Sequence, residues 1–172
     1  MMKRAFVPRF LAVSAIVFFL ATVPPAAGAD DRKIEGSWLT LVTATDPPGL
    51  PAMQGLMTFT HTGEVLESRR LYVLTPFGPL LETGGHGAWE RAGHDDILVK
   101  FIFLVQAAPN HPVLQNGEPL GTGNIHMRLH VDRGGQTFSG TFVSQARDPQ
   151  GNLLFTARGT VQGTRIRPEP LP

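Results

Sequence analysis

Apolar and polar residues alternate in short runs along this chain, from about residue 37 to residue 166. The period of two is typical of half-buried β-strands, and no stretch of this region has the spacing of a convincing amphipathic helix. Glycine, proline and polar turn residues separate the runs. The pattern predicts an all-β fold with eight strands, at residues 37–44, 54–61, 64–73, 87–91, 96–106, 123–132, 136–147 and 152–166.

The connections between these strands differ in length in an ordered way. The tight ones are residues 62–63, 92–95 and 133–135, and the turn at 148–151 is also short. The long ones are residues 45–53, 74–86 and 107–122. In an up-and-down meander, successive connections alternate between the two ends of the sheet. All the long loops therefore share one end, which we call the mouth, and the other end, the floor, has only tight turns.

An antiparallel meander of eight strands can close into a barrel and so remove both edges of the sheet. The sequence therefore predicts an eight-stranded antiparallel up-and-down barrel. A β-sandwich is the alternative fold, but its long crossover connections fit the short sequential hairpins less well.

The first 29 residues have the features of a secretory signal peptide. Lys3, Arg4 and Arg9 precede an apolar run, and small residues at 27–29 offer a cleavage site. The apolar run is shorter than the roughly 20 residues of a membrane-spanning helix. We therefore predict export to the periplasm or the extracellular space, with no stable membrane anchor after cleavage. A single barrel domain is expected at residues 30–166, followed by a disordered proline-rich tail at 167–172.

Composition narrows the classes of function. Without the leader the chain has 12 basic and 14 acidic residues and no block of Lys or Arg, which argues against nucleic acid as a partner. There is no cysteine, so no disulfide stabilises the exported chain. Phosphate-binding and serine-hydrolase motifs are absent, and the histidines lack the close spacing of metal ligands. The sequence thus predicts no cofactor and no metal site, and it identifies no catalytic residue.

Gly36-Ser37-Trp38 opens the first predicted strand, and Arg165 lies near the end of the last one. These residues resemble the Gly-x-Trp motif and the terminal-strand Arg of lipocalins and related calycin barrels. The resemblance implies a structural pair, Trp38 against Arg165, at the closed end of a barrel. Chain direction gives the same placement, because the first strand starts and the last strand ends at the floor. The Thr-Asp-Tyr-type motif, C-terminal helix and disulfide of classical lipocalins are missing.

The strand at 64–73 must place charged groups inside a barrel. Glu67 and Arg69 share one of its faces, Ser68 and Arg70 share the other, and the alternation leaves both orientations open. A buried ion needs a partner, and it would give an apolar cavity a polar anchor.

The strand at 123–132 leaves a similar choice. Its His126, Arg128 and His130 form either a solvated outer stripe or, with the histidines as acid–base groups, the wall of a polar lumen.

A second Gly-x-Trp segment, Gly87-Ala88-Trp89, opens the strand at 87–91. Because that strand runs from mouth to floor, Trp89 is predicted near the mouth, as a rim or lumen aromatic. The candidate ligand-binding side chains are the charged and aromatic groups of the interior and the mouth: Trp89, Glu67, Arg69, Tyr72, Phe77, Phe101 and Phe103.

The strand at 96–106 is apolar on both faces, as strands covered on both sides are. Its outer face is expected to be covered by a folded-back loop or by a second copy of the chain, which would make a homodimer.

Three functions remain open. The leading hypothesis is a non-enzymatic barrel that binds a small, largely apolar molecule at the mouth. The second is a small-barrel enzyme of the cyclase or isomerase type that uses Glu67, Arg69 or His126. The third is a structural or protein-interaction module with a filled barrel.

Overall fold

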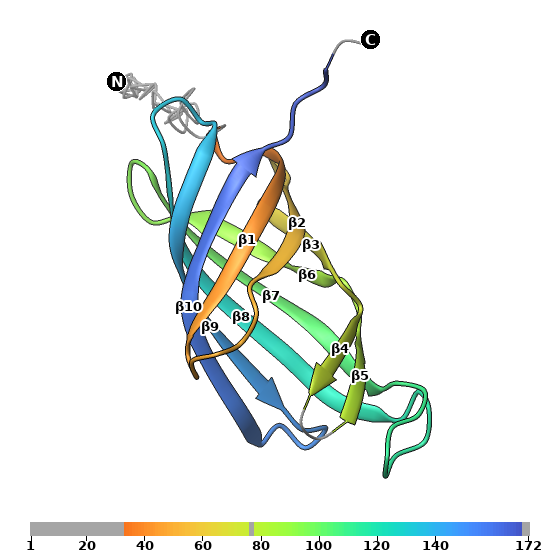
Figure 1. Ribbon diagram of the computed structural model, residues 1–172. Helices are drawn as coiled ribbons and strands as arrows, with labels where there is room; N and C mark the ends of the chain where they lie inside the picture. Colours follow the sequence, from red (N-terminus) through yellow and green to blue (C-terminus); the bar gives the residue numbers. More distant parts are fainter. Residues whose placement is uncertain (1–32, 76–77, 170–172) are drawn as a thin grey trace, which may run out of the picture.

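Ten β-strands account for most of the chain that the computed structural model describes, which is residues 33–75 and 78–169 (Figure 1). They are β1 (Gly36–Asp46), β2 (Met53–Phe59), β3 (Glu64–Arg69), β4 (Tyr72–Thr75), β5 (Gly78–Glu82), β6 (Gly85–Arg91), β7 (Asp96–Ala107), β8 (Pro119–Val131), β9 (Thr137–Arg147) and β10 (Leu153–Arg165). Within these ranges no helix is long and apolar enough to cross a membrane.

Eight of these strands form a closed antiparallel barrel. The sheet runs β7-β6-β3-β2-β1-β10-β9-β8 and closes because β7 also pairs with β8. The up-and-down barrel predicted from the connection lengths is confirmed, and the β-sandwich alternative is wrong. The remaining two strands form a hairpin, β4–β5, that extends the barrel wall beyond β3 and β6 and pairs with the second half of β7.

One of the three predicted long loops is largely this hairpin. Residues 74–86 contain the end of β4, all of β5 and the start of β6, and the predicted strand at 64–73 is broken between β3 and β4. The prediction was wrong because glycines were taken as loop signals. Gly78 instead begins β5 with a φ of 130°, and Gly84 and Gly85 lie where the strand is interrupted.

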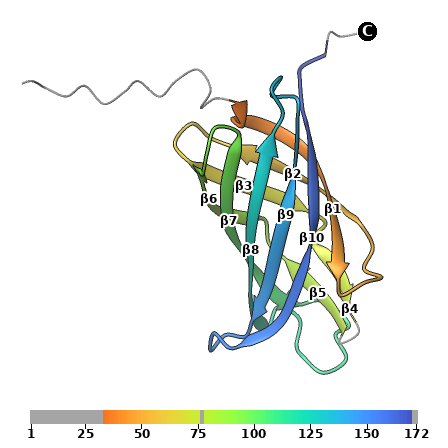
Figure 2. The same ribbon diagram turned by 90° about the vertical axis from the view of Figure 1, so that its left-hand side faces the viewer.

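The two ends of the barrel differ as the connection lengths predict. The turns at 60–63, 92–95 and 132–136 lie at the end where β1 starts and β10 ends (Figures 1 and 2). The connections at 47–52 and 108–118 lie at the opposite end, together with the end of β4 and the start of β5.

Trp38 and Arg165 close the floor together with the segment before β1. The two residues are opposite each other in the β1–β10 ladder, and the guanidinium carbon lies 4.3 Å from the centre of the indole ring. The indole Nε1 donates a hydrogen bond to the Ile34 carbonyl at 2.8 Å. The guanidinium donates to the backbone carbonyls of Lys33, Glu35 and Gly135. Arg165 thus ties three separate parts of the chain together.

Aromatic rings inside the barrel lie across glycines of the neighbouring strand. The cross-strand pairs are Gly87 with Phe101, Gly123 with Phe103, Gly159 with Phe142 and Gly163 with Phe138. A Cβ atom on Gly123 would stand only 1.8 Å from the Phe103 ring, and one on Gly163 only 2.2 Å from the Phe138 ring. Barrels of about eight strands are just wide enough for packed side chains. A glycine opposite each ring therefore lets the ring fill the interior.

The interior is packed at the floor and opens toward the mouth. Trp38, Val65 and Leu129, which face inward near the floor, have no exposed surface. Val42 and Ala146 face inward nearer the mouth and are only half-buried. The floor half is therefore a packed core, whereas inward-facing side chains such as Val42 and Ala146 keep part of their surface exposed.

Gly123→Ala is expected to destabilise the barrel by about 1–3 kcal/mol, because the new Cβ would overlap the Phe103 ring. The free energy of unfolding is measured by urea denaturation. Gly93→Ala in the β6–β7 turn is the control. Its Cβ would stand 3.7 Å from the Asp96 Cβ, an ordinary contact, and the change should be within about 0.5 kcal/mol. Equal losses in the two variants would contradict the ring–glycine packing.

Arg165→Met is expected to cost about 2–3 kcal/mol, because three carbonyl oxygens lose a charged hydrogen-bond donor. Arg158→Met, on the exposed face of the same strand, should change stability far less. Thermal and urea unfolding of both variants test the difference. A loss no greater at position 165 than at position 158 would show that Arg165 does not hold the floor.

Candidate functional site

The register of β3 decides which of its faces points inward. Glu67 is the cross-strand partner of Met57, which is fully buried in the core. Directly paired residues project from the same face of a sheet. Glu67 therefore faces inward, as does Arg69 two residues later, whereas Ser68 and Arg70 are exposed on the outer face.

A β-bulge brings a second carboxylate to the same interior region. The register of β5 and β6 against β7 shifts by one residue between the pairs Glu82–Val105 and His86–Ile102. The extra residue lies near Thr83, whose backbone and side chain both form hydrogen bonds with β7. Bulges re-aim side chains in this way, and here Glu82 shares the inner face with Val105.

Arg69 lies between the two carboxylates. Its Nε is 3.4 Å from Glu67 Oε1 and 3.3 Å from Glu82 Oε2. Its guanidinium carbon is 3.9 Å from the centre of the Phe103 ring. The side chains of Glu67, Arg69 and Glu82 are only 8%, 11% and 15% exposed. We call these three residues the interior charge cluster.

The hydrogen bonding of this cluster is incomplete. Among the described residues, Glu67 Oε2 and Arg69 Nη2 are buried without a hydrogen-bond partner, and Arg69 Nε approaches both carboxylates without hydrogen-bond geometry. A buried polar atom without a partner costs about 1–3 kcal/mol. The cluster therefore holds one acceptor, Glu67 Oε2, and two donors, Arg69 Nε and Nη2, whose hydrogen bonds are unmade among the described residues.

Glycine at position 85 lets the backbone of β6 pack closely against Glu67 and Phe101. A Cβ on Gly85 would stand 3.1 Å from Glu67 Oε2 and 2.5 Å from the Phe101 ring. Any larger residue there would crowd both the carboxylate and the ring.

Burial raises the pKa of both carboxyl groups. For Glu67 desolvation is the largest cause; Arg69 lowers the pKa and the charge of Glu82 raises it further. For Glu82 desolvation again outweighs the opposing effect of Arg69. One guanidinium thus compensates two buried carboxylates only in part, and the cluster has one negative charge in excess when both are ionised.

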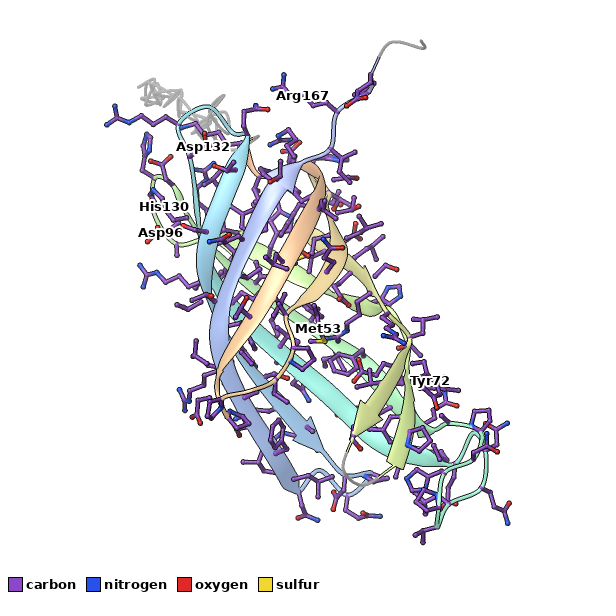
Figure 3. The ribbon with its side chains drawn as sticks, in the orientation of Figure 1. Met53, Tyr72, Asp96, His130, Asp132 and Arg167 are labelled. Atoms are coloured by element: carbon purple, nitrogen blue, oxygen red, sulfur yellow. The ribbon has the colours of Figure 1, made fainter. Side chains whose placement is uncertain are left out.

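Four of the seven predicted ligand-binding residues lie in or beside the interior charge cluster: Glu67, Arg69, Phe101 and Phe103. Tyr72 does not. It pairs with Leu81 in a row that faces outward, and it is 37% exposed on β4 (Figure 3). Phe77 lies outside the described residues.

Trp89 lies at the floor and not near the mouth. Its indole Nε1 donates a hydrogen bond to the Thr60 carbonyl in the β2–β3 turn, at 3.0 Å. Its ring packs edge-on against Phe59, with 6.2 Å between the ring centres. The predicted position was wrong because residues 78–82 form β5, which moves the mouth away from the start of β6.

The polar stripe of β8 faces solvent. Its residues alternate with buried ones such as Ile125, and His126, Arg128 and His130 are exposed. The alternative that placed the two histidines in a polar lumen is therefore wrong, and His126 is not available for chemistry there.

The outer surface near the floor has two shallow hollows, of about 310 and 350 Å³. His130 lines the first, and its Nδ1 lies 3.1 Å from Asp96 Oδ1; the two residues lie near each other on this side of the barrel in Figure 3. Ser139 is its cross-strand partner on β9. The backbone N–H groups of these central strands are used in the β-ladder. Among the described residues, Asp96, His130 and Ser139 therefore have beside them no free pair of backbone N–H donors, which acyl transfer needs to stabilise an oxyanion.

In the described ranges, no group of three or more His, Asp or Glu residues is placed to hold a metal ion.

Glu82 was missed as an interior residue by sequence reasoning, which placed it in a mouth loop. The available signal was Gly84-Gly85 between an apolar run and a strand, since glycine inside a strand often marks a bulge.

No family model matches the chain, and no curated protein matches it. Among solved structures, the chain is similar to the structure of EF1p2_mFAP2b bound to DFHBI, with 14% sequence identity and a TM-score of 0.49. The similarity covers 78% of this chain and 95% of that chain. We draw no functional conclusion from a similarity this distant.

Glu67→Gln should gain stability relative to the wild type as the pH rises above about 4, the ordinary pKa of a glutamate in the unfolded chain. The raised pKa of Glu67 means that the folded protein holds more protons than the unfolded chain between the two pKa values. Ionisation of Glu67 therefore reduces the free energy of unfolding as the pH rises, and glutamine removes this loss. The measurement is the difference in the free energy of unfolding between variant and wild type at each pH.

Asp96→Asn is the control of opposite sign. Hydrogen bonds from Arg128 and His130 lower the pKa of Asp96, so its ionised form stabilises the fold at higher pH, and this is lost as the pH falls through the folded pKa. The cost of Asp96→Asn should therefore grow as the pH rises. Parallel pH profiles for the two variants would contradict the burial of Glu67.

Proposed function

We propose that this protein binds a small, largely apolar molecule through the mouth of its barrel, with the head group of that molecule at the interior charge cluster. The observation that carries the proposal is the pair of unpartnered buried atoms, Glu67 Oε2 and Arg69 Nη2, in a largely apolar interior. Small-molecule sites combine apolar lining with a few placed polar groups.

The residues at the mouth support entry of an apolar molecule. Leu50, Met53, Leu153 and Phe155 are large apolar side chains with 41–51% of their surface exposed, and all lie at or beside the mouth-side ends of β2 and β10. A contiguous patch of exposed apolar side chains often marks a binding region, whereas single exposed apolar side chains do not.

We also propose that the barrel is a calycin-type protein that is exported. The contact between Trp38 and Arg165 at the floor supports the first part. The basic leader, apolar run and small-residue site within residues 1–29 support the second. A homodimer through the outer face of β7 remains a proposal, supported by Ile102 and Leu104, which are apolar and exposed there.

Calorimetry with 1-octanol as a neutral apolar probe tests binding. We use calorimetry because Trp38 and Trp89 both lie at the floor and would report poorly on the mouth. Ala146 faces inward on β9 in the same cross-strand row as Gly123 and Phe103. Ala146→Trp should weaken binding at least about tenfold by filling the mouth half, a difference that calorimetry resolves.

Thr141→Trp adds the same side chain to the exposed face of β9 and is the matched control. It should leave the affinity for 1-octanol at the wild-type value, with both variants checked for folding by circular dichroism. Equal binding by wild type and Ala146→Trp would place any octanol site outside the barrel. Absence of binding to the wild type would contradict the proposal directly.

A second candidate function uses the same cluster for catalysis. Burial raises the pKa of Glu67, which is the direction that favours a general acid. Native mass spectrometry of the purified protein would identify a co-purified molecule. Incubating that molecule with wild type and with Glu67→Gln separates the two functions. A chemical change only with the wild type supports catalysis, whereas an unchanged molecule in both supports binding alone.

A further inference from the structure

We infer that the interior charge cluster selects a positively charged head group, so that the molecule bound by the barrel is an organic amine with an apolar body. This inference rests on the proposed function, because it names the class of ligand for the same site.

The charges that face this site are unbalanced. Glu67 from β3 and Glu82 from β5 supply two carboxylates, and Arg69 from β3 supplies one guanidinium. The groups that approach the cluster from β1, β2, β6 and β7 are neutral: Thr40, Gly55, Gly85 and Phe103. A cationic head would remove the excess negative charge, whereas an anionic head would add to it.

The unpartnered acceptor points to the same class. Glu67 Oε2 is buried without a hydrogen bond among the described residues, and an ammonium group is a donor only. A hydrogen bond between two charged groups is shorter and stronger than one between neutral groups. An amine therefore satisfies the charge and the hydrogen bond of Glu67 together, whereas the Arg69 Nη2 donor gains no partner from it.

Arg69 does not reverse this preference. Its guanidinium lies within 3.4 Å of both carboxylates and stacks on the Phe103 ring, so its charge is already shared. A carboxylate ligand that reaches Arg69 would lie beside two like charges in a region of low dielectric, where such repulsion is strong.

The apolar body of the ligand would lie on the mouth side of the cluster. The floor side of the cluster is filled by buried residues such as Met57 and Phe101. The inward-facing positions toward the mouth, such as Val105 and Ala146, are only half-buried. An amine would therefore enter head first, with its apolar body toward the mouth.

Three probes with the same eight-carbon body test the inference: octylamine, 1-octanol and octanoate. Each is titrated by calorimetry into the full exported chain at neutral pH. We expect octylamine to bind at least about tenfold tighter than 1-octanol, and octanoate to bind more weakly than 1-octanol. Glu67→Gln should bring the ratio of amine to alcohol affinity close to one. Glu82→Gln is the second variant, in case the first does not fold, and should also lower the ratio.

Glu90→Gln is the matched control, because Glu90 lies on the exposed face of β6 and its removal changes the net charge equally. It should keep the wild-type ratio. An octanoate affinity equal to or above that of octylamine overturns the inference. The inference is also overturned if both Glu67→Gln and Glu82→Gln keep the wild-type preference for octylamine over 1-octanol, or if Ala146→Trp binds octylamine as tightly as the wild type does. In those cases 1-octanol binding still supports the proposed function. If none of the three probes binds, the proposed function itself fails.

Discussion

The limited volume inside an eight-stranded barrel is the constraint on which the rest of this structure depends. Such a barrel has space for one layer of packed side chains and little more. Here the aromatic rings fit because glycines stand opposite them, as Gly163 does for Phe138 and Gly123 for Phe103. The Phe138–Gly163 pair and the Trp38–Arg165 contact lie in the floor half. Toward the mouth, inward-facing residues such as Val42 and Ala146 are only half-buried.

Buried charge makes the boundary between the two halves chemically distinct. Removing ions from water is costly unless they are paired and hydrogen-bonded. A buried charge cluster with incomplete hydrogen bonding therefore lowers the stability of the fold. Glu67, Arg69 and Glu82 have such an incomplete arrangement. Natural sequences tolerate local costs of this kind mainly at functional sites. This is why the cluster, and neither the floor nor the outer histidine stripe, carries the functional proposals.

Much of the fold could be predicted from local patterns, and the errors have a common cause. Period-two alternation located the barrel strands to within a few residues, and connection length distinguished the mouth from the floor. The error at residues 74–86 came from glycines taken as loop signals, although they allow a bulge and a hairpin. That error moved Trp89 to the wrong end of the barrel and left Glu82 in a loop. Two of the three residues of the interior charge cluster were nevertheless named, since Glu67 and Arg69 share one face of a strand.

By itself the sequence determined that the fold is all-β, that the strands form a meander, and which residues share one face of each strand. These features follow from local alternation and from connection length. Only the tertiary structure decided which face of β3 points inward and that a bulge turns Glu82 toward Arg69. These depend on the register between strands far apart in the chain, such as β5 with β7. A shift of one residue in register exchanges the inner and outer faces of a strand. The interior charge cluster is therefore a product of register, and no local pattern contains it.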